Sequence, residues 1–85
     1  MAHTILIVDD DPDIVAYLED VFSDEGYDTI SARNGRQALS AIENEQPDAI
    51  TLDLEMPDMT GPKFNRALEK SGRDIPIVVI TGHPG

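Results

Sequence analysis

Hydrophobic residues in this chain fall into continuous aliphatic runs and helically spaced positions. The continuous run at residues 4–8 predicts a strand buried on both faces, as in a parallel sheet, and residues 49–54 and 75–81 predict two further strands. Residues 27–32 predict one more short strand. The run at 75–81 is the strongest strand pattern in the sequence.

Helical spacing appears between these runs. Asp11 is a good N-cap and Pro12 suits the first position of a helix, which Gly26 would end. Its apolar positions are Ile14, Val15, Leu18, Val21 and Phe22. Asn34 and Gly35 open a second helix, whose inner face would be Ala38, Leu39 and Ile42. Pro62 starts a third helix that carries Phe64 and Leu68 on one side.

Strands and helices therefore alternate along the chain, beginning and ending with a strand. This order predicts an α/β fold, with parallel strands joined by right-handed crossovers into a doubly wound sheet. We expect one domain over residues 1–85, because the length suits a single small core and no linker or repeat interrupts it.

Charge narrows the possible partners. Six basic and 17 acidic side chains give a formal net charge of -11, which disfavours binding to nucleic acid or to an anionic membrane surface. No cysteine is present, and the N-terminal aliphatic run is too short for a secretory signal. We therefore expect a cytoplasmic protein that binds cations or basic protein surfaces.

Acidic residues follow two of the predicted strands. Asp9 and Asp10 end the first, Asp53 ends the third, and Thr81 ends the fourth. Ligands of doubly wound sheets collect outside the carboxyl ends of the strands. If the first and third strands are neighbours, the carboxylates converge, and their repulsion predicts a divalent cation. An oxygen-only ligand set favours Mg²⁺, with Mn²⁺ able to substitute. A carboxylate beside that metal could attack phosphorus.

Simpler interpretations exist for each residue. Asp11 is best explained as a helix cap, and Asp9 with Asp10 could be a solvated helix start favoured by the dipole. Alone, Asp53 would be a turn residue and Thr81 a β-branched strand residue. The placement of all of them at strand ends favours a common site.

Three segments together carry a family resemblance: "ILIVDDDPDI", "DAITLDLEMPDMTG" and "IPIVVITGH". They resemble the receiver domain of two-component response regulators over essentially the whole chain. The resemblance implies a flavodoxin-like fold with strand order 2-1-3-4, here with about four strands and three helices. It also implies a phosphorelay module that receives its phosphoryl group from a histidine kinase or phosphotransfer protein, a switch and not a turnover enzyme.

The resemblance assigns roles to individual residues. Asp53 would be the phosphoacceptor and Thr81 the switch hydroxyl. Asp9 and Asp10 would hold Mg²⁺ together with Asp53, and the main-chain carbonyl of Glu55 would be a further ligand. Met56, Pro57 and Gly61 match the family's loop after the acceptor.

Receiver domains continue past the fourth strand with a helix, a fifth strand that ends in a lysine, and a last helix. Without these elements, residues 75–81 would be an apolar sheet edge, and we expect a homo-oligomer formed through that strand. An alternative function is a non-phosphorylated interaction or dimerisation module with a vestigial acidic pocket. A further alternative takes Asp53 to Glu55 as the nucleophile motif of a haloacid-dehalogenase-like phosphatase, which would also need a lysine and a cap.

Overall fold

The computed structural model describes residues 3–53, 66, 69–70, 72 and 74–80. The elements in chain order are β1 (Thr4–Val8), α1 (Pro12–Asp24), β2 (Asp28–Ala32), α2 (Gly35–Glu45), β3 (Ala49–Asp53) and β4 (Ile77–Ile80). All four predicted strands form, and β4 begins after Pro76, which has no N–H to donate to a neighbouring strand.

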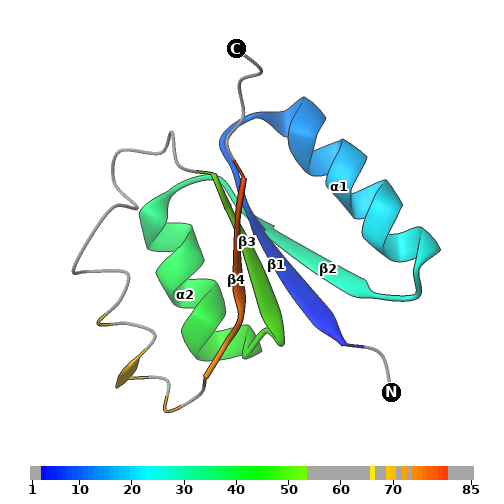
Figure 1. Ribbon diagram of the computed structural model, residues 1–85. Coiled ribbons are helices and arrows are strands. Elements are labelled where there is room, and N and C mark those ends of the chain that lie inside the picture. Colours follow the sequence, from blue (N-terminus) through cyan, green and yellow to red (C-terminus); the bar gives the residue numbers. More distant parts are fainter. Residues whose placement is uncertain (1–2, 54–65, 67–68, 71, 73, 81–85) are drawn as a thin grey trace.

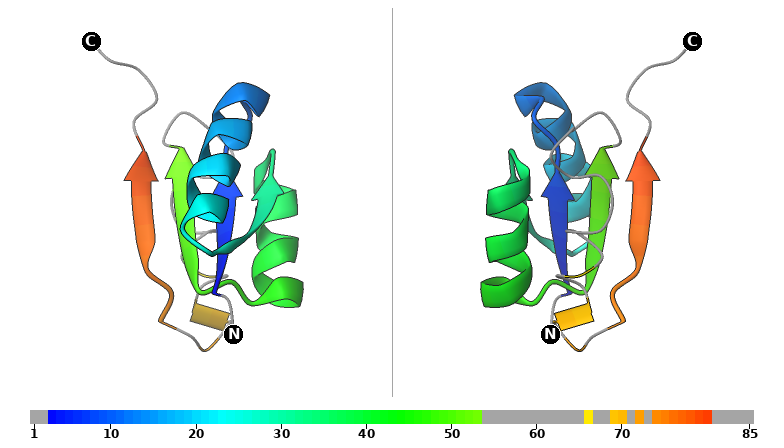
Figure 2. Two further views of the ribbon diagram at one scale, coloured as in Figure 1. Left: turned by 90° about the vertical axis from the view of Figure 1, so that its right-hand side faces the viewer. Right: turned by 90° about the vertical axis from the view of Figure 1, so that its left-hand side faces the viewer.

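The four strands form one parallel sheet in the order β2-β1-β3-β4. The predicted α/β architecture and strand order are therefore confirmed. The helices α1 and α2 lie on opposite faces of the sheet, and β2 and β4 are its two edges (Figures 1 and 2). Because β1 and β3 are neighbours, their carboxyl ends lie side by side.

Both helices begin at the caps that the sequence indicates. The side chain of Asp11 accepts a hydrogen bond from the N–H of Asp13 at 2.9 Å. Asn34 Oδ1 accepts from the N–H of Gln37 at 2.9 Å, and Gln37 Oε1 accepts from the N–H of Arg33 at 2.8 Å. The bonds from the N–H groups of Asp13 and Gln37 satisfy donors that a helix start leaves without an intrahelical partner, and the bond from Arg33 ties the residue before the cap to α2.

The end of α1 also follows the prediction. Gly26 has a φ of +91°, a left-handed conformation that suits glycine, and its N–H donates to the carbonyl of Ser23 at 3.0 Å. The chain can then turn directly into β2.

The apolar core lies between the sheet and α2. Its buried members are Leu6, Val8, Ala32, Ala38, Ile42, Ile50 and Leu52. Leu39, which the sequence placed on the inner face of α2, is partly buried against this cluster. On the other face, α1 packs on β1 and β2 without a fully buried residue of its own.

The predicted third helix lies mostly outside the described residues. Within that segment, Arg66, Glu69 and Lys70 are helical, whereas Pro62, Phe64 and Leu68 are among the residues not described. In the part of the chain that the structure describes, no helix combines the length and apolar character needed to cross a membrane.

Candidate functional site

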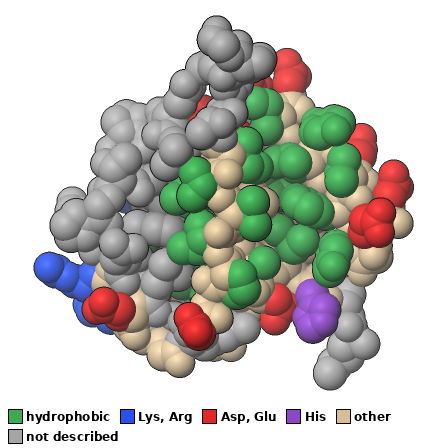
Figure 3. Space-filling model, viewed as in Figure 1, with side chains coloured by type: hydrophobic (Ala, Val, Ile, Leu, Met, Phe, Trp, Pro, Cys, Tyr) green, Lys and Arg blue, Asp and Glu red, His purple; other side chains and the backbone are tan. Residues whose placement is uncertain are grey.

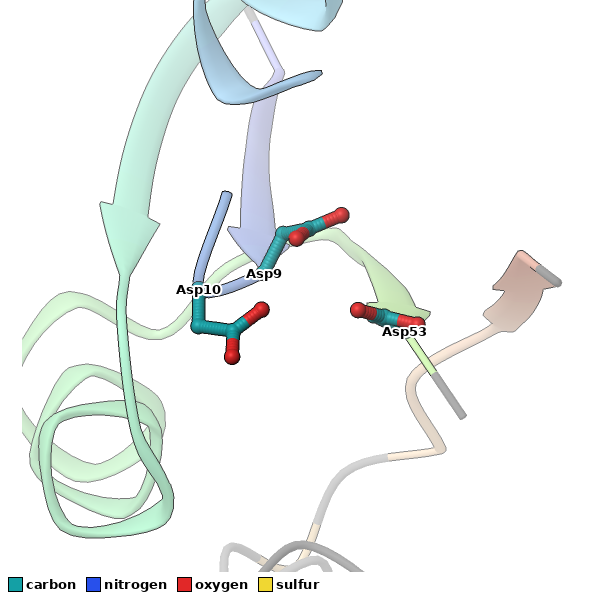
Figure 4. A group of neighbouring side chains, drawn as sticks. All are labelled: Asp9, Asp10 and Asp53. Atoms are coloured by element: carbon teal, nitrogen blue, oxygen red, sulfur yellow. The ribbon is translucent and has the colours of Figure 1, made fainter. Parts of the chain in front are cut away.

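Three carboxylates meet at the carboxyl edge of the sheet. Asp9 and Asp10 follow β1, and Asp53 is the last residue of β3. One carboxylate oxygen from each lies within 4.8 Å of those of the other two. Figure 4 shows the three side chains around a common space, with Asp9 and Asp53 reaching it from neighbouring strands.

Burial differs among the three acids. Asp9 is only 2% exposed and Asp53 is 7% exposed, whereas Asp10 is exposed. Asp9 Oδ1 accepts a hydrogen bond from the N–H of Asp11 at 2.9 Å. The site therefore has two acids set into the sheet and one on its rim, which leaves an open side for a ligand.

The ionised form of Asp9 is disfavoured in this position. Burial raises the pKa of Asp9 above its ordinary value of 3.8, and the charges of Asp53, Asp10 and Asp11 raise it further. The hydrogen bond from the Asp11 N–H acts in the opposite direction, but the pKa is raised on balance. A cation between the carboxylates would remove this penalty.

The donor set fits a hard divalent cation. Carboxylate oxygens are the ligands that Mg²⁺ prefers, and Mg²⁺ sites in proteins keep several waters on a few carboxylates. The exposed position of Asp10 leaves room for such waters. The fold thus brings together three of the predicted ligands from two distant parts of the chain.

The remaining candidate residues differ in whether the structure describes them. Glu55 and Thr81 lie outside the described residues, so their roles stay predictions. Asp11 caps α1 through its side chain, as the simpler interpretation had it. His3 lies at the opposite end of β1, where its Nδ1 is 3.6 Å from Asp48 Oδ2.

One buried polar group was missed in the sequence. Thr51 is 5% exposed, and its Oγ1 has no hydrogen-bond partner among the described residues. It lies in β3 two residues before Asp53, between Ile7 of β1 and Val78 of β4. The only signal was a threonine inside an otherwise aliphatic run.

Comparison with known proteins decides the family. A family model described as "Response regulator receiver domain" matches residues 5–85. This chain belongs to that family. The receiver domain is a signal-transduction module of two-component response regulators, which agrees with the resemblance found in the sequence.

Individual relatives support the same assignment. The chain is 37% identical over 83 residues to sporulation initiation phosphotransferase F of Bacillus subtilis, covering 98% of this chain and 67% of the relative. It is 42% identical over 81 residues to the response regulator MprA of Mycolicibacterium vanbaalenii, covering 95% of this chain but 35% of that protein. The chain thus spans only part of the length of these relatives.

A solved structure gives the matching fold. The chemotaxis response regulator CheY4 of Vibrio cholerae superposes with a TM-score of 0.83 at 30% identity, over 100% of this chain and 72% of that one. Together with the strand order, this likeness places the chain in the receiver fold.

Proposed function

We propose that this receiver domain accepts a phosphoryl group on Asp53 with Mg²⁺ bound beside it. The observation that carries the proposal is the convergence of Asp9, Asp10 and Asp53 within 4.8 Å at the carboxyl edge of the sheet. Receiver domains act with histidine kinases or phosphotransfer proteins, so the donor would be one of these, in the cytoplasm where ATP-dependent kinases operate.

The reaction would be a simple phosphoryl transfer. A carboxylate oxygen of Asp53 forms a bond to phosphorus while the bond between phosphorus and the donor breaks, and the leaving group keeps the electron pair and takes up a proton. The product is an acyl phosphate on Asp53. This is one stoichiometric event on the protein's own side chain, and hydrolysis of the acyl phosphate would reset it.

The neighbouring acids would complete a metal site beside Asp53. Asp9, Asp10 and Asp53 would hold Mg²⁺, which when bound neutralises charge on the transferring phosphoryl oxygens. Asp9 Oδ1 accepts a hydrogen bond from the Asp11 N–H, which holds the side chain in place. Its other carboxylate oxygen would then be available to the metal. The carbonyl of Glu55 and the hydroxyl of Thr81 extend the proposal as a further ligand and as the switch hydroxyl.

The first test is the intact mass of the protein after incubation with acetyl phosphate and Mg²⁺. We expect wild type to gain one phosphoryl group and Asp53→Ala to gain none. Asp28→Ala is a matched control, because Asp28 is an exposed acid at the opposite end of the sheet and should leave the gain unchanged. A chelator should abolish the wild-type gain.

Two results would contradict the proposal. A wild-type protein that folds and binds Mg²⁺ yet gains no mass would favour the alternative of a non-phosphorylated interaction module. A phosphoryl group that remains on Asp53→Ala would place the acceptor elsewhere. Turnover of a phosphatase substrate would instead support the haloacid-dehalogenase-like alternative.

We also propose that the 85-residue chain self-associates through β4. In this edge strand Val78 is 57% exposed and Val79 is 50% exposed. Hydrophobic side chains gather in the middle of the face shown in Figure 3, over the region between β4 and α1 in the view of Figure 1. An exposed apolar sheet edge is a template for pairing with another chain.

The association can be measured by light scattering at micromolar concentration. We expect an oligomer for wild type and a monomer for the double variant Val78→Lys, Val79→Lys. Val21→Lys serves as the control, since Val21 is 39% exposed on α1, away from the edge. A monomeric wild type would refute self-association and leave the phosphoacceptor proposal standing.

A further inference from the structure

A groove lies along the β2 edge of the sheet, separate from the three acids. Its cavity has a volume of about 710 Å³. The outer side of β2 contributes Thr29, Ile30 and Ser31, and Glu19 of α1 lies at the groove as well. The remaining lining comes from α2: Arg36, Gln37, Ser40, Ala41, Asn44 and Glu45.

The α2 residues form a continuous stripe. Arg36, Ser40 and Asn44 are spaced four residues apart, and the others are their immediate neighbours, so all six share one side of the helix. Asn44 Nδ2 donates to Ser40 Oγ at 3.1 Å, which orders two polar groups along the stripe. The stripe runs alongside β2 and makes one wall of the groove.

The sheet edge itself offers main-chain hydrogen bonds. The Asp28 N–H donates to the His3 carbonyl, and the Ala32 carbonyl accepts from the Asp9 N–H. These bonds show which β2 residues face β1: the main-chain groups of Asp28, Ile30 and Ala32 bond to β1. The alternate residues Thr29 and Ser31 therefore direct their N–H and C=O groups away from the sheet. No other strand of the described part of the chain pairs with this edge.

Charge along the groove is uneven. Glu45 ends α2, and exposed Asp28 starts β2, so both acids lie at the end where the strands begin. Glu19 adds a further negative charge from α1, whereas Arg36 lies in the first turn of α2, near the carboxyl ends. Of the three charged residues that line the groove, two are acidic, in a chain whose net charge is -11.

We propose that the β2 groove binds an extended, basic peptide segment of a partner protein, which adds to the sheet as a strand beside β2. The outward N–H and C=O groups of Thr29 and Ser31 would pair with the segment's main chain. Its alternate side chains would face the polar α2 stripe on one side and Glu19 on the other. Lysine or arginine at the end near Asp28 and Glu45 would complete the charge match.

A second copy of this chain does not fit the groove as well. The apolar edge of a second copy is β4, whose side chains Val78 and Val79 differ from the hydroxyl, amide and charged groups that mainly line the groove. Two copies also carry net charge of the same sign, which opposes association at an acidic groove. The two edges of the sheet therefore select different partners.

The proposal can be tested by nuclear magnetic resonance titration of the 85-residue chain with a strand-length probe. The probe is a polythreonine peptide of roughly 8 residues with a lysine at each end, and the comparison peptide carries glutamates instead. We expect saturable shifts of the Thr29 and Ser31 amides, and slower hydrogen exchange at both, with the lysine peptide alone.

Two pairs of variants make the result specific. Ser31→Pro removes one outward N–H without touching a bond to β1, and Ser31→Val keeps that N–H as its control. Glu45→Lys reverses a groove charge, and Glu43→Lys changes an exposed acid of α2 that does not line the groove. We expect Ser31→Pro and Glu45→Lys each to weaken peptide binding about tenfold and the controls to bind as wild type.

Each contrary outcome overturns the proposal. An absence of shifts at Thr29 and Ser31 with millimolar lysine peptide would exclude strand addition at β2. Equal binding of the glutamate peptide would exclude charge recognition. Shifts at Ile77 and Val79 in place of the β2 amides would move the peptide site to β4. These outcomes are independent of whether Asp53 is phosphorylated.

Discussion

The two faces of the sheet are built from the same strands but differ in what they bury. Successive side chains of β1 alternate, so Leu6 and Val8 enter the core beneath α2, while Ile5, Ile7 and then Asp9 belong to the α1 face. The α2 face buries an apolar cluster. The α1 face instead holds the buried hydroxyl of Thr51, which has no hydrogen-bond partner among the described residues.

The two faces therefore differ in what they contribute: the α2 face mainly to stability, and the α1 face to the acidic site. The α2 face can supply most of the hydrophobic free energy because its residues are apolar and close-packed. The α1 face carries a buried acid whose pKa is raised and a buried hydroxyl that none of the described residues satisfies, both of which cost folding free energy. Substitutions of the same type should therefore have different effects on the two faces.

The largest difference in stability between the two faces should appear when a matched pair of isoleucines is truncated to alanine. Ile42 of α2 is 1% exposed in the core, whereas Ile14 of α1 is only partly buried. We expect Ile42→Ala to lower the free energy of unfolding by about 2–5 kcal/mol and Ile14→Ala by about 1 kcal/mol. Urea unfolding of both variants measures this. Equal losses would mean that the α1 face is as well packed as the α2 face.

Mg²⁺ should stabilise the protein only through the acids on the α1 side of the sheet. If Asp9, Asp10 and Asp53 hold the ion, Mg²⁺ at about 100 times its dissociation constant should raise the free energy of unfolding by about 2.7 kcal/mol. The Asp9→Asn variant should lose most of this gain, whereas Asp28→Asn, at the far end of the sheet, should keep it. Equal Mg²⁺ effects on wild type and Asp9→Asn would exclude the cluster as the site.

Structural features that depend on a few adjacent residues were easier to predict from the sequence than features that depend on how distant segments pack. The caps at Asp11 and Asn34 and the glycine turn at Gly26 follow from a few adjacent residues, and all three were predicted. The convergence of Asp9 with Asp53 needed one assumption about strand order, which the family resemblance supplied and the fold confirms.

Features that depend on how many elements cover each face were not predictable in this way. The apolar positions of α1 resembled those of a fully packed helix, yet none of them is fully buried, whereas α2, which packs on the same two strands, buries Ala38 and Ile42. The groove at β2 was missed for a similar reason. It exists only because an edge strand and the side of α2 lie together in space, and neither looks unusual in the sequence.

Without Mg²⁺, removal of the Asp9 charge should stabilise the protein. The raised pKa means that the ionised carboxyl costs folding free energy, so at neutral pH we expect Asp9→Asn to have a higher free energy of unfolding than wild type. Between pH 3.8 and the raised pKa, folded wild type binds more protons than unfolded wild type. Its free energy of unfolding should therefore fall as the pH rises through this window.

The same pH dependence provides a control for the Asp9 prediction. The advantage of Asp9→Asn over wild type should be absent well below pH 3.8 and complete above the folded-state pKa. Thermal unfolding of both proteins in chelator across this range measures it. An advantage that does not change with pH would point to packing and not to charge.

The smallest effect should come from the buried hydroxyl of Thr51. Valine has nearly the same shape and no unpaired polar atom, so Thr51→Val should raise the free energy of unfolding by about 1 kcal/mol. Thr29→Val is the control, because Thr29 lies in β2 at the open groove and is only partly buried. It should change stability by less than about 0.5 kcal/mol. If Thr51→Val were destabilising by urea unfolding, the hydroxyl would have a partner in solution, and the α1 face would be better satisfied than its contrast with the α2 face implies.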